Sequence, residues 1–358
     1  MKRHSSDRIR NVAVCGHGGT GKTSLVEAML FAAKAIERLG RVEEGTTTTD
    51  FDAEEIRRRI TISAALAPLE WQDHKINLID TPGYPDFIGE VSGALRAVES
   101  IALTVDAVAG VEVQTEKIWA LAARASASRL VVVTRMDREN ASFARAVDSL
   151  QQKFGRQLVP LQSPIGSEGG FSGVVDLVTM QASGDAGAIP RDKIPADALE
   201  AATAMRERLV EAVAETDERL TEVYLEQGQL ADDALTQGLH AAVRAGTLVP
   251  VLCVAATRGR GVAPLLDALV RLLPAPTERD PIGAHNGKGT AVPVAPDPAG
   301  PLAAQVWKTM ADPYVGKLSY FRVFSGVLKS DAQVWNAGKG KVERIGQLLQ
   351  LRGKHQEP

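Results

Sequence analysis

Short apolar runs alternate with longer amphipathic stretches over the first three quarters of the chain. The runs hold few polar side chains, which is typical of strands that are buried on both faces. The stretches between them repeat apolar residues at helical spacing, as in residues 111–127. Buried strands that alternate with helices predict a mostly parallel α/β sheet. The predicted strands are residues 12–15, 65–71, 75–79 (a hairpin with the preceding strand), 101–105, 130–133 and 249–254, and the predicted helices are 24–31, 89–98, 111–127, 140–154 and 264–273.

The pattern changes in the middle of this α/β region. Residues 159–178 are glycine-rich and β-like, and residues 190–246 are rich in Ala, Glu and Arg and helical in pattern. Because residues 249–254 resume the buried strands, we predict a subdomain inserted at about 158–246 into a first domain that spans residues 1–276.

Two other regions lack this alternation. Residues 277–300 are rich in proline and glycine, which predicts a linker. From residue 301 to 358 the apolar runs are short and separated by turn signals, which predicts the N-terminal part of an antiparallel β-barrel.

Within the first domain, residues 40–62 are polar and charged without a clean period, so we predict a long, mobile surface segment there.

Composition and charge narrow the function classes. The net charge is −3, so no overall basic field draws the chain to DNA or to a membrane surface. The basic start of the chain has no apolar signal-peptide core, and the most apolar run is too short to span a bilayer. Cys15 and Cys253 both lie in apolar runs, which favours buried free thiols in a reducing cytoplasm over a disulfide.

A glycine-dense turn separates the first predicted strand from the first predicted helix. Residues 16–23 fit G-x-x-x-x-G-K-[ST] at every fixed position. Glycines let backbone N–H groups approach a phosphate, Lys22 adds a positive charge, and Thr23 offers a hydroxyl to Mg²⁺. The alternative is a glycine-rich turn with a chance Lys-Thr pair, but strand, loop and helix stand in the order that a triphosphate cradle needs. The predicted nucleotide contacts here are Gly16, His17, Gly18, Gly19, Thr20, Gly21, Lys22, Thr23 and Ser24.

A second polar turn, Asp80-Thr81-Pro82-Gly83, follows a predicted strand. Phosphoryl transfer needs an acidic group there that holds Mg²⁺ directly or through water, and Gly83 can bring a backbone N–H close to the γ-phosphate. The alternative is a plain turn, which the upstream phosphate loop makes the weaker interpretation. Thr61 is our candidate for a second Mg²⁺ hydroxyl, with the alternative that it merely begins a strand.

A third polar group ends another strand, where the sequence reads Thr134-Arg135-Met136-Asp137. A carboxylate there can accept from both N1–H and the exocyclic amine of guanine, a pair that adenine does not offer. The alternative is that Asp137 caps the following helix, and both roles can hold. Ala255 and Ala256 follow the last buried strand, and their backbone N–H groups can reach the guanine oxygen, which is a weak signal alone. Nothing in the sequence pairs His17 with a base or a metal.

With these motifs in order, the chain resembles the translational GTPases, and most closely elongation factor G. Residues 59–62 look like the first switch segment of that family and residues 80–83 like its second. Residues 160–166 and 171–177 look like the opening of the subdomain that is inserted in elongation factor G. Residues 312–318, 321–323 and 325–326 look like its barrel domain. The resemblance implies GTP or GDP and Mg²⁺ as cofactors, and GTP hydrolysis on the ribosome that is coupled to translocation.

The resemblance also implies roles for residues of this sequence. Thr23, Thr61 and Asp80 are expected at Mg²⁺. Lys22, Gly83 and Tyr84 are expected at the reacting phosphate. Besides residues 16–24, the expected guanine-nucleotide contacts are Asp80, Thr81, Pro82, Gly83, Tyr84, Thr134, Arg135, Met136, Asp137, Ala255 and Ala256. The ribosome is the expected partner, with no DNA or membrane partner, and the chain is expected to be a cytoplasmic monomer.

Several positions depart from the family pattern. The family usually has His where Tyr84 stands, and since a phenol ionises only at about pH 10, it is a poor base toward water. Asp is usual at Gly19, Asn and Lys at Thr134 and Arg135, and Ser at Ala255. These changes indicate a divergent paralogue whose hydrolysis is slow or differently stimulated.

Elongation factor G has further domains after the barrel, so we expect a fragment or truncated product that does not carry out translocation alone. Two hypotheses remain open: a GTP hydrolase, or a nucleotide-gated binding module with little or no hydrolysis. A third, a phosphate-loop kinase, is disfavoured because no residues suggest an acceptor pocket and because Asp137 points to guanine.

Overall fold

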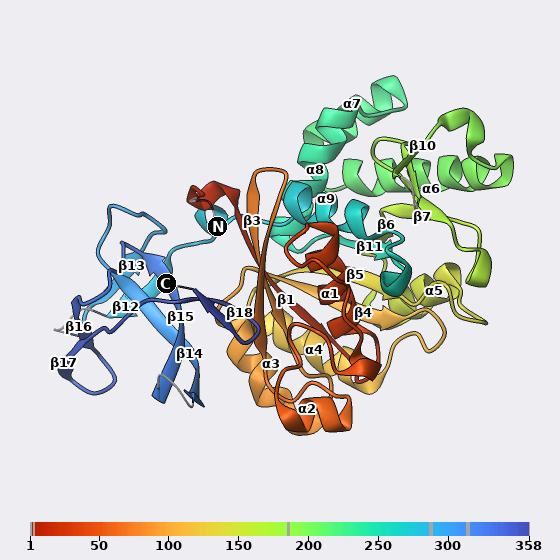
Figure 1. Cartoon of the computed structure of the whole chain (residues 1–358). Helices are drawn as coiled ribbons and strands as arrows, with labels where there is room; N and C mark the ends of the chain where they lie inside the picture. The colour runs from red at the N-terminus through yellow and green to blue at the C-terminus, as the bar shows by residue number, and fades with distance from the viewer. Residues whose placement is uncertain (1, 3, 185–186, 286–288, 313–315, 358) are drawn as a thin grey trace.

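The computed structural model describes every residue except 1, 3, 185–186, 286–288, 313–315 and 358. A seven-stranded sheet forms the centre of the larger part of the molecule (Figure 1). Its neighbouring strands are parallel except for the β2–β3 hairpin, which confirms the predicted mostly parallel α/β sheet. The order across the sheet is β2 (Ala65–Trp71), β3 (His74–Asp80), β1 (Ile9–Gly16), β4 (Ser100–Asp106), β5 (Ser128–Thr134), β11 (Val249–Cys253) and β6 (Leu158–Pro160).

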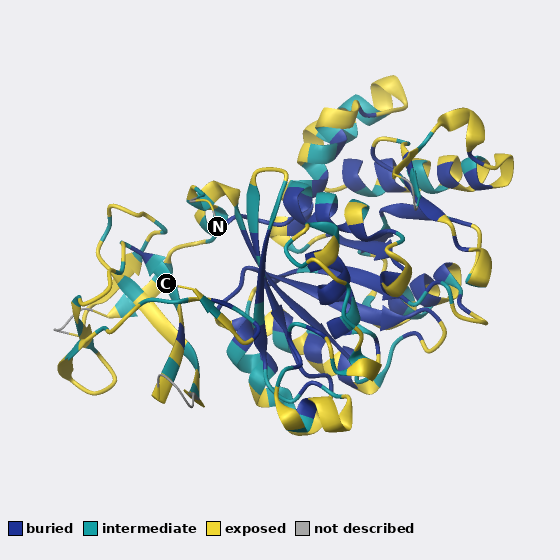
Figure 2. Ribbon diagram, viewed as in Figure 1, coloured by how far each residue is buried: buried dark blue, intermediate teal, exposed yellow. Residues whose placement is uncertain are grey.

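The strands are apolar on both sides because helices cover both faces of the sheet (Figure 2). Along β1, Val12 and Val14 belong to one core, while Ala13 and Cys15 belong to the other. Cys15 and Cys253 are buried free thiols, as predicted. The first core includes residues of α1 (Lys22–Ala32) and α9 (Val262–Leu272), and the second includes residues of α3 (Ile88–Leu95), α4 (Val113–Arg124) and α5 (Phe143–Phe154).

A smaller antiparallel sheet and three helices lie beside this core (Figure 1). They fall within the insertion predicted at 158–246, but both ends of that range belong to the main layer. β6 is an edge strand of the seven-stranded sheet, and α8 contributes Leu235 and Leu239 to the first core. The elements are β7 (Gln162–Ile165), β8 (Gly173–Asp176), β9 (Ala182–Gly184), β10 (Gly187–Ile189), α6 (Ala196–Ala214), α7 (Glu218–Gln227) and α8 (Asp232–Ala245).

The segment between α1 and β2 corrects one sequence prediction. It contains a 3₁₀ turn at Val42–Glu44 and the helix α2 (Ala53–Arg58), which begins with a capping box formed by Asp52 and Glu55. Glu55 is buried, and its carboxylate also accepts from the N–H groups of two residues after the helix. The prediction of a surface segment is therefore wrong for its buried residues. Its buried polar residues are Thr47, Thr49, Asp50, Glu55 and Thr61.

The predicted linker at 277–300 is also not a plain linker. It contains an antiparallel hairpin of β12 (Ile282–His285) and β13 (Ala291–Val294). Pro293 lies within β13, which a two-stranded ladder tolerates because each strand keeps a free edge. The proline content therefore obscured a hairpin that the composition alone did not predict.

Antiparallel ladders make up the rest of the chain, which confirms antiparallel β-structure after the α/β part. In the part of the chain that the structure describes, these ladders stay two-stranded. Pro313, Tyr314 and Val315 of the family-like stretch 312–318 lie outside the described residues. The ladders pair β14 (Ala303–Asp312) with β15 (Gly316–Ser325), β16 (Gln333–Asn336) with β17 (Lys341–Arg344), and β18 (Gln350–Arg352) with β19 (His355–Glu357).

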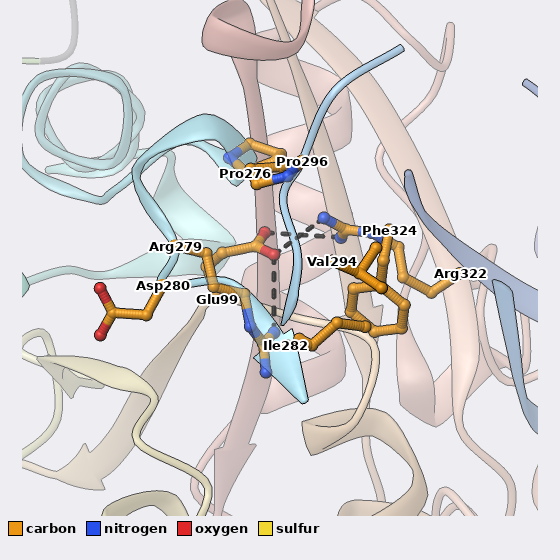
Figure 3. Close-up of a pocket in the computed structure, with 9 residues that line it drawn as sticks. All are labelled: Glu99, Pro276, Arg279, Asp280, Ile282, Val294, Pro296, Arg322 and Phe324. Carbon is orange, nitrogen blue, oxygen red and sulfur yellow. Dashed lines mark hydrogen bonds and ion pairs between the residues drawn. The ribbon is translucent and has the colours of Figure 1, made fainter. Parts of the chain in front are cut away.

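A buried carboxylate joins the two parts of the molecule (Figure 3). Glu99 accepts from Asn11 Nδ2 at 2.7 Å and from Arg322 Nη2 at 2.8 Å, and Arg279 Nη1 lies 3.8 Å from it. The ring of Phe324 lies 5.5 and 5.6 Å from the two guanidinium groups. Only 3% of the Glu99 side chain is exposed, so this ion pair is shielded from solvent.

A second contact connects the C-terminal ladder to β2 and to the segment before it. Gly353 N–H donates to the Leu66 carbonyl at 2.8 Å, and Arg352 Nη1 donates to the Ala35 carbonyl at 2.7 Å. A Cβ at Gly353 would overlap the Thr48 carbonyl. The second part of the chain therefore touches the segment that carries several of the candidate site residues.

Candidate functional site

The phosphate loop connects β1 to α1 and turns sharply at its glycines. Gly19 and Gly21 both have φ of +81°, a left-handed conformation that side chains rarely adopt. Lys22 folds back over the loop, and its Nζ donates to the carbonyls of Gly16 at 3.1 Å and His17 at 2.7 Å. Burial lowers the pKa of Lys22 to about 8. The ammonium is held by neutral acceptors, and a phosphate would be a stronger partner for it.

The turn after β3 packs directly on this loop. A Cβ added to Gly83 would overlap Lys22 Nζ and lie 2.7 Å from the His17 carbonyl, so a larger residue does not fit. Tyr84 lies with its ring against Gly18, whose added Cβ would lie 3.2 Å from Tyr84 Cζ. The structure therefore brings the three residues predicted at the reacting phosphate to one place, with Tyr84 at its solvent side, where it is 42% exposed.

Some predicted contacts at this end use their side chains structurally. Thr81 Oγ1 donates to the Val14 carbonyl at 2.8 Å, and Thr20 Oγ1 donates to a carbonyl of the loop at 2.9 Å. Pro82 is buried, and Ser24 lies in the first turn of α1. The N–H groups of Thr20 and Thr81 also donate within the protein, to the carbonyls of His17 and Val14, so these two residues shape the loop and the turn.

His17 has partners that the sequence did not indicate. Its Nε2 lies 3.4 Å from Glu112 Oε1, and its Nδ1 accepts from the Gln114 N–H at 3.4 Å. The sequence offered no base or metal partner for His17, and the structure shows a carboxylate and a backbone N–H beside it instead. The imidazole links the phosphate loop to the start of α4.

Hydroxyls and carboxylates meet beside the phosphate loop. Thr23 Oγ1 lies 2.9 Å from Thr61 Oγ1, and Thr49 Oγ1 donates to Asp80 Oδ2 at 2.7 Å. Asp80 Oδ1 and both carboxylate oxygens of Asp50 are buried without a hydrogen-bond partner among the described residues. Burial and the neighbouring charge of Asp80 raise the pKa of Asp50 to about 7, and burial raises the pKa of Asp80 to about 6.

This oxygen cluster fits a small divalent cation. Buried carboxylate oxygens without a partner are costly, and a hard cation such as Mg²⁺ prefers carboxylate, hydroxyl and phosphate oxygens. Among the described residues no three His, Cys, Asp or Glu side chains form a metal-binding group, so the hydroxyls of Thr23 and Thr61 are needed to complete the set. Asp50 is the member that sequence reasoning missed. Its signal was a run of threonines that ends in a carboxylate, in the segment that also holds Thr61.

The residues after β5 form the other end of the site. Thr134 Oγ1 donates to the Thr20 carbonyl at 2.7 Å, which ties this strand end to the phosphate loop. Arg135 Nη1 lies 2.9 Å from Asp106 Oδ2. Burial raises the pKa of Asp106, but the Val108 N–H and the Arg135 guanidinium more than offset this, so the pKa lies below its usual value.

Met136 and the cap prediction need correction. Only 1% of Met136 is exposed and its side chain belongs to the second core, so a side-chain contact to a nucleotide is excluded there. The helix α5 is capped by Ser142, whose Oγ accepts from the Arg145 N–H, so Asp137 is not its N-cap. The alternative interpretation of Asp137 as a helix cap is therefore wrong.

Asp137 instead faces the short turn after β11. Its Oδ2 lies 3.1 Å from Arg258 Nε, in a 3₁₀ turn at Ala256–Arg258. The N–H of Ala255 already donates to the Arg260 carbonyl at 2.9 Å, so the predicted Ala255 donor is engaged. Ala256 is left as the predicted backbone donor, and Arg258 is a further polar residue that sequence reasoning missed.

Comparison with known proteins identifies the family of this chain. Residues 7–275 match the family model of the elongation factor Tu GTP binding domain, and residues 301–358 match that of elongation factor G domain 2. The chain belongs to the translational GTPases. A crystal structure of a protein from Thermus thermophilus is similar to this translational GTPase, with 36% identity and a TM-score of 0.84 over 98% of this chain and 50% of that protein. The chain thus spans about half the length of that relative.

Membership confirms the resemblance to elongation factor G-like translational GTPases that the motifs indicated. The family consists of GTP-binding translation factors, so a guanine nucleotide is the ligand class of this translational GTPase. Within the described residues, no helix is both long and apolar enough to cross a membrane.

Proposed function

We propose that this translational GTPase binds GTP and GDP with Mg²⁺ and hydrolyses GTP as a translation factor of the elongation factor G type. The observation that carries the proposal is the cluster beside the phosphate loop. There Lys22 and the paired hydroxyls of Thr23 and Thr61 adjoin the partnerless carboxylate oxygens of Asp50 and Asp80. Positive charge and oxygen ligands are the two things that a Mg²⁺-triphosphate needs.

Each group has a role that its position allows. The loop backbone and Lys22 hold the β- and γ-phosphates. Thr23, Thr61, Asp50 and Asp80 hold Mg²⁺, which when bound neutralises phosphate charge. The cluster positions the phosphates, since phosphoryl transfer depends mainly on placement and on electrostatic stabilisation.

The reacting end combines a fixed and an exposed group. Gly83, pressed against Lys22, supplies a backbone N–H near the γ-phosphate. Tyr84 lies at the rim and can orient the attacking water by its hydroxyl. We expect slow intrinsic hydrolysis, as in GTPases whose activating group comes from a partner.

At the other end Asp137 reads guanine, with Ala256 N–H near the guanine oxygen and the stem of Arg135 beside the ring. We propose the ribosome as partner and activator, in a cytoplasmic monomer. This chain spans about half the length of the Thermus thermophilus protein. Translocation is an activity of the whole elongation factor, so it is not part of this proposal.

The test is single-turnover GTP hydrolysis, with and without ribosomes, by the wild type and a Tyr84→His variant. Stimulation of the wild type by ribosomes supports the hydrolase. Stimulation in the variant alone shows intact machinery that Tyr84 restrains.

A second candidate is a nucleotide-gated binding module with little hydrolysis. Tyr84 at the rim favours it, because the side chain packs on Gly18 and is 42% exposed, and a phenol is a poor base toward water. No ribosome stimulation in either protein, with tight GTP binding in both, would establish this second function.

A further inference from the structure

Arg258 contacts the carboxylate that we propose as the guanine reader. Its Nε lies 3.1 Å from Asp137 Oδ2, and its Nη1 donates to the Gly169 carbonyl at 3.3 Å. The neighbouring Ala255 has no hydroxyl that could support the carboxylate from the same turn. The ion pair therefore connects the turn after β11 to the segment that follows β5.

The backbone beneath Arg258 is fixed in place. Its N–H donates to the Ala255 carbonyl at 3.0 Å, and Ala255 forms a bridge with Arg260. The turn ends at Gly259, whose φ of +71° suits glycine. The guanidinium therefore starts from a rigid turn, and its long stem spans the short distance to the carboxylate.

The contact leaves Asp137 free to read a base. A carboxylate has about four lone-pair positions. Guanine N1–H and N2–H need one on each oxygen, so positions remain on Oδ2, which lies 3.1 Å from Arg258 Nε. The ion pair places the planar guanidinium beside Oδ2 and thereby favours one orientation of the carboxylate. Only 18% of the Asp137 side chain is exposed, so water competes weakly for the remaining positions.

We propose that Arg258 is a positioning residue for guanine selection, which holds the carboxylate of Asp137 in the plane that guanine requires. This inference rests on the proposed function. Arg258 also connects the base end to the inserted subdomain, because Gly169 lies in the turn Glu168–Gly170 between β7 and β8. Glu168 from the same turn accepts from the Asn140 N–H at 2.9 Å. The insertion thus supports both sides of the segment that contains Asp137.

The experiment compares GDP with IDP, which lacks the 2-amino group, by calorimetric titration. The proteins are the wild type, Arg258→Ala, Arg258→Lys and the control Arg156→Ala, an exposed arginine beyond the end of α5. In Arg258→Ala we expect GDP affinity to fall about tenfold and IDP affinity to fall less, so that the GDP/IDP ratio drops. Arg258→Lys recovers most of the ratio, and Arg156→Ala leaves it unchanged.

Other results overturn the inference. An equal loss of GDP and IDP affinity in Arg258→Ala means that the arginine only supports the turn. A gain in GDP affinity means that it competes with the base. If the wild type does not prefer GDP over ADP, the proposed function itself fails, which is a different result from an unchanged GDP/IDP ratio in a guanine-selective protein.

Discussion

The phosphate end and the base end of the site are built differently. At the base end the charged groups already have protein partners: Arg258 for Asp137 and Arg135 for Asp106. At the phosphate end, the buried oxygens Oδ1 and Oδ2 of Asp50 and Oδ1 of Asp80 lack hydrogen bonds among the described residues, and Lys22 donates to neutral carbonyls.

This difference indicates at which end of the site the ligand contributes most to the stability of the folded chain. A partner offsets part of the desolvation cost of a charge, whereas a buried carboxylate without a partner destabilises the folded chain. We infer that the base end is preorganised by the protein, while the phosphate end gains its charge balance from Mg²⁺ and phosphate. Substitutions at the two ends should therefore have opposite effects on the protein without its ligand.

The largest effect is expected from Lys22→Met. Loss of the ammonium removes the strongest phosphate contact, so GTP affinity falls by about a hundredfold, which corresponds to about 3 kcal/mol. Titration of GTP in Mg²⁺ buffer measures it, with the exposed Lys117→Met as control. An affinity within about twofold of the wild type would show that the loop does not bind the phosphates.

Asp50→Asn separates stability from binding. In metal-free buffer the amide removes a buried charge without a partner, so the free energy of unfolding rises by about 1–3 kcal/mol. The gain of GTP affinity on adding Mg²⁺ becomes smaller at the same time. Urea unfolding and titration with and without Mg²⁺ check both, and destabilisation of the metal-free chain would contradict the comparison.

The pH dependence follows from the same carboxylates. Because burial raises the pKa of Asp50 to about 7 and of Asp80 to about 6, the folded chain binds more protons than the unfolded chain between about pH 4 and 7. Without metal, their contribution lowers the free energy of unfolding as pH rises through that window, and Asp50→Asn flattens the decline. Unfolding of the two proteins in EDTA at several pH values measures the difference, and identical slopes would refute it.

Thr134→Ala has the smallest expected effect. It removes the hydroxyl that ties the base end to the Thr20 carbonyl, which costs about 1 kcal/mol of stability and a few-fold of GDP affinity. Thermal unfolding with and without GDP measures both the stability and the GDP affinity. A stabilised variant would show that the base end is not preorganised in the way described.

The sequence predicted the parts of the site that lie at strand ends. Residues 16–23, Asp80 and Asp137 were placed because spacing ties each motif to a buried strand, and the sheet followed from strands that are apolar on both faces. Asp50 and Arg258 were missed because their roles arise from packing between distant segments.

Local structure was missed where it has no period. The six-residue helix α2 is too short for a helical repeat, although the spacing of Asp52 and Glu55 was a capping signal. The hairpin of β12 and β13 was hidden by prolines that only an edge strand accepts. Met136 was included as part of a motif, yet its side chain lies in the second core.

The most direct test of the account is the affinity of the purified chain for GTP and ATP, each measured with Mg²⁺ and with EDTA. The account predicts that GTP binds at least about a hundredfold more tightly than ATP, because Asp137 is held ready for guanine, and that Mg²⁺ strengthens GTP binding through the Asp50–Asp80 cluster. Equal affinity for ATP, or GTP binding that is indifferent to Mg²⁺, would contradict it.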